Sequence, residues 1–154
     1  MAVRVTPAGT RGSRRRANVL LRHMLAVASA MYRRGVGRSM GSTRLLLLTT
    51  RGARSGRQWT VPVAWFPDGK DAWLVVASFG GSAHHPAWFH NLARHPEDVW
   101  IEIDDRRIKV RPESLHGAER EERWRRITAV AKNFAGYERK TDREIPVVRL
   151  TPAA

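Results

Sequence analysis

The chain has 154 residues, 42% of them hydrophobic, and no cysteine; this predicts one domain with a buried core and excludes disulfides, thiolate metal sites and a cysteine nucleophile. Its formal net charge is +14, yet residues 1–57 hold 13 arginines and no acidic residue, so the remaining chain has a net charge of only +1. A nucleic-acid-binding domain usually carries its basic surface on the folded body, and we therefore expect no nucleic-acid partner.

The N-terminal part, residues 1–43, is predicted to form a basic arm that precedes one folded domain over residues 44–154. Residues 1–13 have no apolar periodicity and contain turn-forming residues, which indicates a disordered lead-in. Residues 14–34 are predicted to form an amphipathic helix with arginines on its polar face. Its apolar stripe consists of Leu20, Met24, Val27 and Met31, flanked by Leu21, Leu25, Ala28 and Tyr32.

Three interpretations of this helix stay open. An apolar stripe of this kind most often packs on its own domain. A basic amphipathic helix can also lie on an anionic membrane surface, and we expect a cytoplasmic protein with peripheral contact at the inner face of the cell membrane. The arginines at 14–16 and the small residues at 28–30 are typical of a secretion signal, but Arg22 and His23 interrupt its apolar region. The segment is too short and too charged to span a bilayer.

Two predicted strands flank a basic loop. Residues 44–50 form an apolar run, which indicates a strand buried on both faces. Residues 58–66 alternate loosely and include Pro62, which indicates an edge position or a bulge. After a turn at 67–70, residues 72–78 form the returning strand.

The second half of the chain supplies further elements. A glycine-rich turn starts at Ser78, and Pro86 suits the first position of a short helix. The expected elements are a helix over 86–94, a hairpin of strands 99–103 and 107–111, a helix over 116–131 with an apolar stripe of Trp124, Ile127, Val130 and Ala131, and a closing strand over 147–150. Six mostly antiparallel strands with two or three helices predict a mainly β fold, a small barrel with helices at its openings.

The loop at residues 49–57 combines two glycines, three arginines and three hydroxyl residues. Glycine lets backbone N–H groups turn toward a ligand, and the guanidinium fork of arginine matches phosphate or carboxylate. These residues indicate an anion site, with an ordinary basic hairpin turn as the alternative.

Other kinds of site find little support. The histidines at 84, 85, 90 and 95 are spaced so that they do not share a helical face, and no cysteine assists them, so we expect no metal site. The chain has no G-x-G-x-x-G or G-x-x-x-x-G-K-[ST] loop and no G-x-S-x-G motif.

The remaining candidates are small, hydroxyl and aromatic residues, namely Thr60, Pro62, Ala77, Ser78, Trp88 and Tyr137. Such a pocket lacks a strong nucleophile or general base, which is typical of a protein whose bound cofactor supplies the chemistry. Trp88 and Tyr137 are explained equally well as core aromatics.

Several of these motifs are similar to those of a known protein family. The chain resembles the deazaflavin-dependent nitroreductase and quinone reductase family, whose members use coenzyme F420, an 8-hydroxy-5-deazaflavin. The resemblance rests on residues 46–57 (LLLTTRGARSGR), Pro62, residues 75–78 (VVAS) with Gly80 and Gly81, residues 85–88 (HPAW) with Asn91 and Leu92, and residues 141–147 (TDREIPV). It covers residues 44–150 and implies a split β-barrel of the FMN-binding type.

The resemblance implies a cofactor site in which the arginine-rich loop holds the anionic phosphate and oligoglutamate tail, while the strands line the deazaflavin ring. The implied cofactor-binding residues are Arg51, Arg54, Ser55, Gly56, Arg57, Thr60, Val61, Pro62, Ala77, Ser78, Gly80, Gly81, Trp88 and Asn91. Ser78 and Tyr137 are the implied catalytic residues. Ser78 would hydrogen-bond the ring, and Tyr137 would orient the acceptor and supply a proton.

Three positions depart from the family pattern. Phe79 stands where lysine is frequent, Trp59 stands where a basic residue is common, and Phe134 stands where some members carry a second tyrosine. A phenyl ring cannot donate a hydrogen bond. This argues against activation of nitroimidazoles and leaves cofactor binding unaffected.

Together these features predict an oxidoreductase that passes a hydride from reduced F420 to a small-molecule acceptor, either a quinone, a nitro compound or a similar flat molecule. An FMN- or haem-binding protein on the same barrel, or an F420 carrier without turnover, is the alternative. A non-enzymatic basic protein is disfavoured, because the near-neutral body carries the pocket motifs. The oligomeric state stays open.

Overall fold

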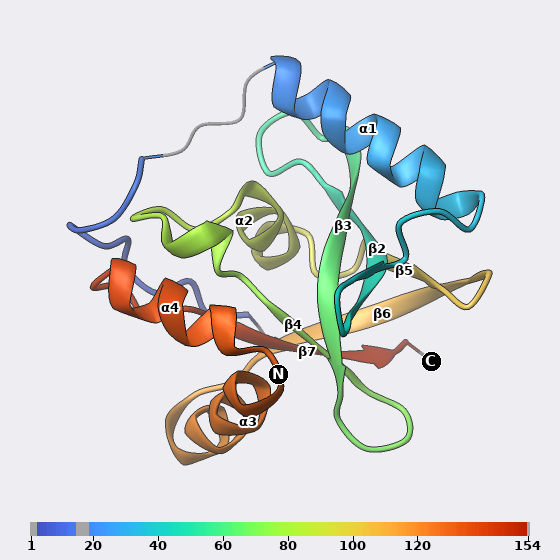
Figure 1. Cartoon of the computed structure of the whole chain (residues 1–154). Coiled ribbons are helices and arrows are strands. Elements are labelled where there is room, and N and C mark those ends of the chain that lie inside the picture. Colours follow the sequence, from blue (N-terminus) through green and yellow to red (C-terminus); the bar gives the residue numbers. More distant parts are fainter. Residues whose placement is uncertain (1–2, 15–18, 154) are drawn as a thin grey trace.

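The computed structural model of the chain describes residues 3–14 and 19–153 (Figure 1). Its elements are α1 (Val19–Arg33), β1 (Ser39–Met40), β2 (Thr43–Arg51), β3 (Gln58–Pro67), β4 (Trp73–Val76), the 3-10 turn η1 (Phe79–Gly81), α2 (Ala87–Arg94), β5 (Val99–Ile103), β6 (Arg106–Ser114), α3 (Gly117–Val130), α4 (Lys132–Lys140) and β7 (Val147–Pro152). The predicted strands and three predicted helices are therefore present, with bounds shifted by a few residues.

The strands form an antiparallel barrel. The sheet order is β1-β2-β3-β4-β7-β6-β5, and β5 also pairs with β2, which closes a ring of six strands. The two-residue strand β1 extends the β2 edge. The expected mainly β fold of six antiparallel strands with flanking helices is confirmed.

The barrel is open along one stretch of β3. This strand pairs with β2 from Gln58 to Ala64, but its pairing with β4 covers only Trp65 to Pro67. Over the described residues, the first part of β3 thus has a strand partner on one edge alone. Pro62 lies in this stretch, which agrees with the expected edge position, because proline cannot donate a backbone hydrogen bond to a second neighbour.

Two apolar cores hold the helices to the barrel. One fills the barrel interior and includes Leu46, Leu48, Val75, Ala77, Phe89, Leu92, Val99, Ile101, Ile103, Val110, Val148 and Leu150. The other lies between the outer face of the barrel and α3 and α4, and includes Phe66, Leu74, Val76, Leu115, Trp124, Ile127, Ala131, Phe134, Ile145 and Val147. The continuous burial of Leu46–Thr50 on β2 confirms the expected strand with two covered faces.

The C-terminal helices differ from the sequence prediction in two ways. The sequence predicts Val130 on the apolar stripe of this helix, α3, but its side chain is 64% exposed. The backbone changes direction at Ala131, whose φ is −117° and ψ is 84°, and α4 begins directly afterwards. The sequence does not predict this second helix, because no glycine or proline separates it from α3.

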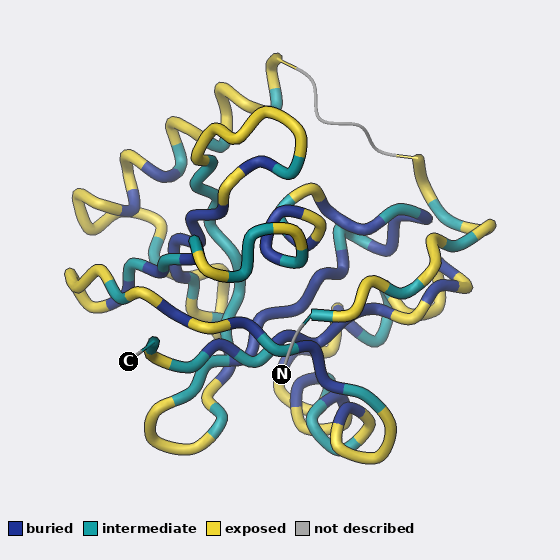
Figure 2. The backbone as a smooth tube through the Cα atoms, turned by 180° about the vertical axis from the view of Figure 1, so that it is seen from behind, coloured by how far each residue is buried: buried dark blue, intermediate teal, exposed yellow. Residues whose placement is uncertain are grey.

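The orientation of α1 is the main correction to the predicted fold. The expected apolar stripe points outward: Leu20, Met24, Val27 and Met31 are 68%, 59%, 60% and 45% exposed. The helix instead contacts β3, and its buried residues, Ser29 and Tyr32, lie on its other face. Figure 2 shows most of the α1 backbone as exposed, with short buried stretches. The Tyr32 hydroxyl donates a hydrogen bond to the Leu45 carbonyl oxygen at 2.9 Å. The first expected helical residues, 15–18, lie outside the described residues.

The lead-in is also corrected. Residues 3–13, here called the N-terminal strap, lie on the folded body beside η1 and the end of α4 (Figure 1). Backbone hydrogen bonds join Gly9 N to Ala83 O at 2.8 Å and Ala83 N to Ser13 O at 2.9 Å. Asp142 accepts hydrogen bonds from the backbone N–H groups of Thr10 and Arg11 at 2.7 and 2.9 Å. These long-range hydrogen bonds fix a segment that lacks apolar periodicity.

Candidate functional site

The arginine-rich loop, residues 52–57, is the turn of the hairpin formed by β2 and β3. Gly52 N donates to Arg57 O at 2.7 Å, Gly56 N donates to Gly52 O at 3.0 Å, and Arg57 N donates to the Ser55 hydroxyl at 3.2 Å. The loop is thus a closed turn with its own backbone hydrogen bonds. The Ser55 hydroxyl therefore stabilises this turn by accepting a hydrogen bond within it.

The side chains of Arg51, Arg54 and Arg57 are exposed. No described carboxylate forms an ion pair with any of them. Three guanidinium groups, two on the loop and one on the last residue of β2, therefore keep their donors toward solvent. A phosphate or a chain of carboxylates is the ligand that this donor set fits.

Asn91 ties this loop to α2. Its side-chain oxygen accepts a hydrogen bond from Ala53 N at 3.0 Å, and its side-chain nitrogen donates to the Thr50 hydroxyl at 3.1 Å. The Asn91 side chain is buried. Asn91 thus holds the start of the loop against the helix, a role that the sequence prediction of cofactor contact did not include.

The predicted ring-lining residues of β3 divide between its two faces. Val61 packs against the barrel interior. Thr60 and Pro62 point to the opposite face, because successive side chains on a strand alternate. The Thr60 hydroxyl lies 2.8 Å from the Thr49 hydroxyl on β2. Thr60 and Pro62 therefore lie on the outer face, at the open stretch of the barrel.

The glycine-rich turn after β4 has an unusual backbone. Ser78 is helical, with φ −75° and ψ −38°. The three following residues, Phe79, Gly80 and Gly81, have φ values of 46°, 62° and 78°. Positive φ is unfavourable for a residue with a Cβ, so the conformation of Phe79 must be held by its surroundings.

Arg143 lies behind this turn. Its guanidinium donates to the carbonyl oxygens of Ser82, Ala77 and Ser78 at 2.8, 3.1 and 2.7 Å, and to Nδ1 of His85 at 3.1 Å. The side chain is buried, and burial lowers the pKa of Arg143 to about 10, so it stays charged at neutral pH. Residues 141–147 are part of the family resemblance in the sequence, but the sequence predicts no role for Arg143, since charged side chains are mostly exposed.

His85 joins Arg143 to the N-terminal strap. Because Nδ1 accepts the hydrogen bond from Arg143, Nε2 carries the proton and donates to the Thr6 carbonyl oxygen at 2.7 Å. Burial, together with the charge of Arg143 and the neighbouring His90 and His84, lowers the pKa of His85. The neutral imidazole is therefore the form that connects the strap with the turn.

Tyr137 lies on α4, which packs on the same turn. Its half-buried ring meets Phe134 edge-on at 5.6 Å, and its hydroxyl accepts a hydrogen bond from Asn133 at 3.4 Å. Phe134 is buried in the outer core. Trp88, on α2, packs against the barrel core and meets Phe89 edge-on at 6.4 Å.

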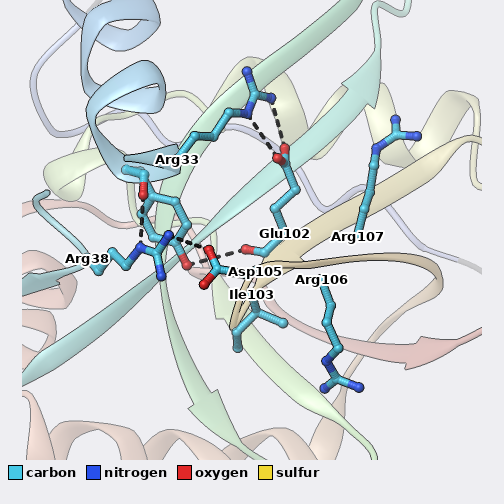
Figure 3. Close-up of a pocket in the computed structure, with 8 residues that line it drawn as sticks. Arg33, Arg38, Glu102, Ile103, Asp105, Arg106 and Arg107 are labelled. Atoms are coloured by element: carbon cyan, nitrogen blue, oxygen red, sulfur yellow. Dashed lines mark hydrogen bonds and ion pairs between the residues drawn. The ribbon is translucent and has the colours of Figure 1, made fainter. Parts of the chain in front are cut away.

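Two cavities lie beside α1. One of about 250 Å³ lies between α1 and β3. Its lining includes Arg22, Ser29, Trp59, Thr60 and Val61. The other, of about 190 Å³, lies at the C-terminal end of α1 near the β5–β6 hairpin (Figure 3). Only the first contains predicted ring-lining residues.

The second cavity is lined by ion pairs. Arg33 and Glu102 are joined at 2.9 Å, and Arg38 and Asp105 at 2.6 Å, while Arg106 extends away from them (Figure 3). The first pair fastens the end of α1 to the hairpin, and the second fastens the turn that follows α1. Among the described residues, no group of three or more histidine, aspartate or glutamate side chains could hold a metal ion.

With this geometry in hand, the comparisons with known proteins identify the family. The family described as F420H(2)-dependent quinone reductase matches residues 21–152. The chain belongs to the F420H(2)-dependent quinone reductase family. It is an F420-dependent oxidoreductase.

Individual relatives agree with this assignment. The F420H(2)-dependent quinone reductase Rv1261c of Mycobacterium tuberculosis is 36% identical over 135 residues, which cover 83% of this chain and 89% of the relative. A solved F420-H2-dependent reductase, FDR-A, is 34% identical with a TM-score of 0.61 and covers 69% of this chain and 92% of its own. A structure described as a domain-swapped dimer is 29% identical, with a TM-score of 0.62, over 81% of this chain and 97% of its own.

The residues of this quinone reductase family member fit the cofactor. The exposed guanidinium groups match a polyanionic tail. The turn after β4 leaves no room for a side chain at Gly81, because a Cβ there would lie 2.8 Å from the Tyr137 carbonyl oxygen. Coenzyme F420 supplies a hydride when it is bound.

Proposed function

We propose that this protein reduces a quinone with a hydride from reduced F420, and that the predicted residues form the cofactor site. Arg51, Arg54 and Arg57 hold the anionic tail. Thr60, Pro62 and the turn after β4 face the ring. Three exposed arginines without a described carboxylate partner carry the tail assignment.

In this proposal the side chains of the site orient the cofactor ring and the quinone, and one of them protonates the quinone. The Ser78 hydroxyl hydrogen-bonds the ring, and the Tyr137 phenol orients the quinone. Reduction of a quinone to a quinol needs one hydride and one proton, and the phenol of Tyr137 donates that proton. Phe134 cannot do so, since it is buried and has no hydroxyl. This favours quinones over nitro compounds as the acceptor class.

The test of this proposal is turnover with a defined acceptor set. The purified full-length protein is supplied with reduced F420 and, separately, menadione and a nitroimidazole, and oxidation of F420 is followed by absorbance. We expect quinone-dependent oxidation and little with the nitroimidazole. Binding of F420 without oxidation by any quinone would contradict the proposal and favour a carrier.

We also propose peripheral association with an anionic membrane at its cytoplasmic face. Nearly all the large exposed apolar side chains lie in one segment of the chain: Val19, Leu20, Met24, Val27, Met31, Val36 and Met40. The same segment carries exposed arginines and no acidic residue. Apolar side chains flanked by cations are the composition of a helix that lies in a lipid interface.

A second copy of the chain is a less suitable partner for this face. Two copies of α1 would bring arginines together without a carboxylate from either helix, and like charges repel. Among the described residues, no helix is long and apolar enough to cross a membrane. A quinone dissolved in lipid would be accessible to a protein docked in this way.

A further inference from the structure

Arg143 is the most heavily engaged buried charge near the proposed ring site. Its side chain is 5% exposed, and it forms no ion pair with a described carboxylate. Burying a cation without a counter-charge is costly unless hydrogen bonds satisfy its donors. Here four hydrogen bonds satisfy the guanidinium donors of Arg143, and all four acceptors belong to residues 77–85.

The backbone of this segment has a conformation that needs support. A non-glycine residue at positive φ, as Phe79 is with φ 46°, persists where the surrounding structure over-determines it. Two of the carbonyl oxygens held by Arg143, those of Ala77 and Ser78, come directly before Phe79. Ala77 N also donates to Pro146 O at 3.0 Å, so the segment that carries Arg143 forms two hydrogen bonds with Ala77.

A helical residue followed by a residue of positive φ turns successive backbone N–H groups toward one side. Ser78 and Phe79 form such a pair. The concavity accepts an anion or a polarised oxygen, and its shape depends on the carbonyl groups of the turn staying in place.

We propose that Arg143 is the positioning residue of the cofactor site: it holds the turn at residues 77–82 in the form that receives the deazaflavin ring. The inference rests on the proposed placement of the ring at this turn. Arg143 acts from behind and does not touch the cofactor. Lysine cannot replace it, because a single ammonium group does not match four acceptors held by a planar fork.

The chain offers a matched control in Arg120. Its side chain is also 5% exposed, and it donates to the Ile145 carbonyl oxygen at 2.7 Å and not to the turn itself. Arg143→Lys and Arg120→Lys should both lower the melting temperature. We expect only Arg143→Lys to weaken F420 binding, by tenfold or more in calorimetry, and to speed amide hydrogen exchange in residues 77–83. Equal affinity of Arg143→Lys and the parent would overturn the proposal, as would an equal loss in Arg120→Lys.

A second variant separates positioning from general destabilisation. Glycine adopts positive φ freely, so Phe79→Gly in the Arg143→Lys background should recover F420 affinity at least threefold. Asp104 also has positive φ, 51°, in the β5–β6 turn. Asp104→Gly in the same background should recover nothing, and equal recovery by both glycines would contradict the proposal.

One measurement needs no variant. If Arg143 holds the turn, the amides of Gly81 and Ser82, which donate to the carbonyl oxygens of Ser78 and Phe79, exchange slowly in the parent even without F420. Fast exchange that becomes slow only on F420 binding would overturn the inference whether or not the variants fold. A parent that does not bind F420 at all would instead refute the proposed function, while this exchange experiment would still test Arg143.

Discussion

Gly81 lies directly against the backbone of Tyr137: a Cβ at position 81 would be 2.8 Å from the Tyr137 carbonyl oxygen and 2.9 Å from the Lys140 side chain. The turn after β4 and the helix that carries the proposed proton donor are therefore one packed unit. Gly81 also has φ 78°, which disfavours other residues. A change in the turn is expected to move the tyrosine.

Tyr137→Phe should lower kcat for quinone reduction by about a hundredfold, the lower end of the range for loss of a general acid. F420 affinity should stay within twofold. Tyr32→Phe is the matched control, since the Tyr32 hydroxyl donates to Leu45 O and serves stability. Steady-state kinetics and calorimetry make the comparison. An unchanged kcat in Tyr137→Phe would show that the proton comes from elsewhere.

Replacing Arg51 and Arg54 with alanine should weaken F420 binding at least tenfold, about 1.4 kcal/mol, because two charge-assisted contacts to the tail are lost. The parent's affinity should fall as salt rises. The double variant Arg111→Ala and Arg125→Ala removes the same charge from exposed positions elsewhere. If both double variants bind F420 like the parent, the tail does not lie on the loop.

The outward face of α1 can be tested without disturbing its inward face. Leu20→Gln, Met24→Gln and Val27→Gln together should abolish sedimentation with anionic vesicles, since these side chains are exposed. Turnover with a water-soluble quinone should be kept. Retained vesicle binding in the triple variant, or no binding by the parent at low salt, would refute membrane docking through α1.

Deletion of residues 3–13 tests the N-terminal strap. The strap contributes several hydrogen bonds to the segment around Ala83 and to Asp142, and each such bond is worth about 0.5–1.5 kcal/mol. We expect a lower melting temperature and weaker F420 binding, with vesicle sedimentation unchanged. Equal F420 affinity in the shortened protein would show that the strap does not support the site. Deleting the whole arm would confound these effects.

Acid should loosen the strap through His85. Its folded pKa lies below the unfolded value of about 6.5. The unfolded chain therefore binds the proton first, so His85 makes its full contribution above that value and loses it as pH falls toward the folded pKa. The loss is at most about 1.4 kcal/mol per pH unit for one proton.

His85→Asn keeps an acceptor for Arg143 and removes the titration. In urea unfolding between pH 4.5 and 7, this variant should show a shallower pH slope than the parent. His90 also has a lowered pKa from burial and the charge of His84, so His90→Gln is the comparison. An identical slope in parent and His85→Asn would exclude His85 as the titrating group.

The sequence by itself determined the strands, the arginine-rich loop and the family. Leu46 to Leu48 and the loop at 52–57 are local patterns, and hydrophobic periodicity with turn residues is a short-range signal. The tertiary structure alone decided which face of α1 is covered, that residues 3–13 are ordered, and that Arg143 is buried. Each of these depends on partners far along the chain: α1 meets β3, Gly9 bonds to Ala83, and Arg143 bonds to Ala77. The local sequence predicts the opposite: arginine is usually exposed, and a segment without apolar periodicity is usually disordered. Long-range contacts therefore decided these features.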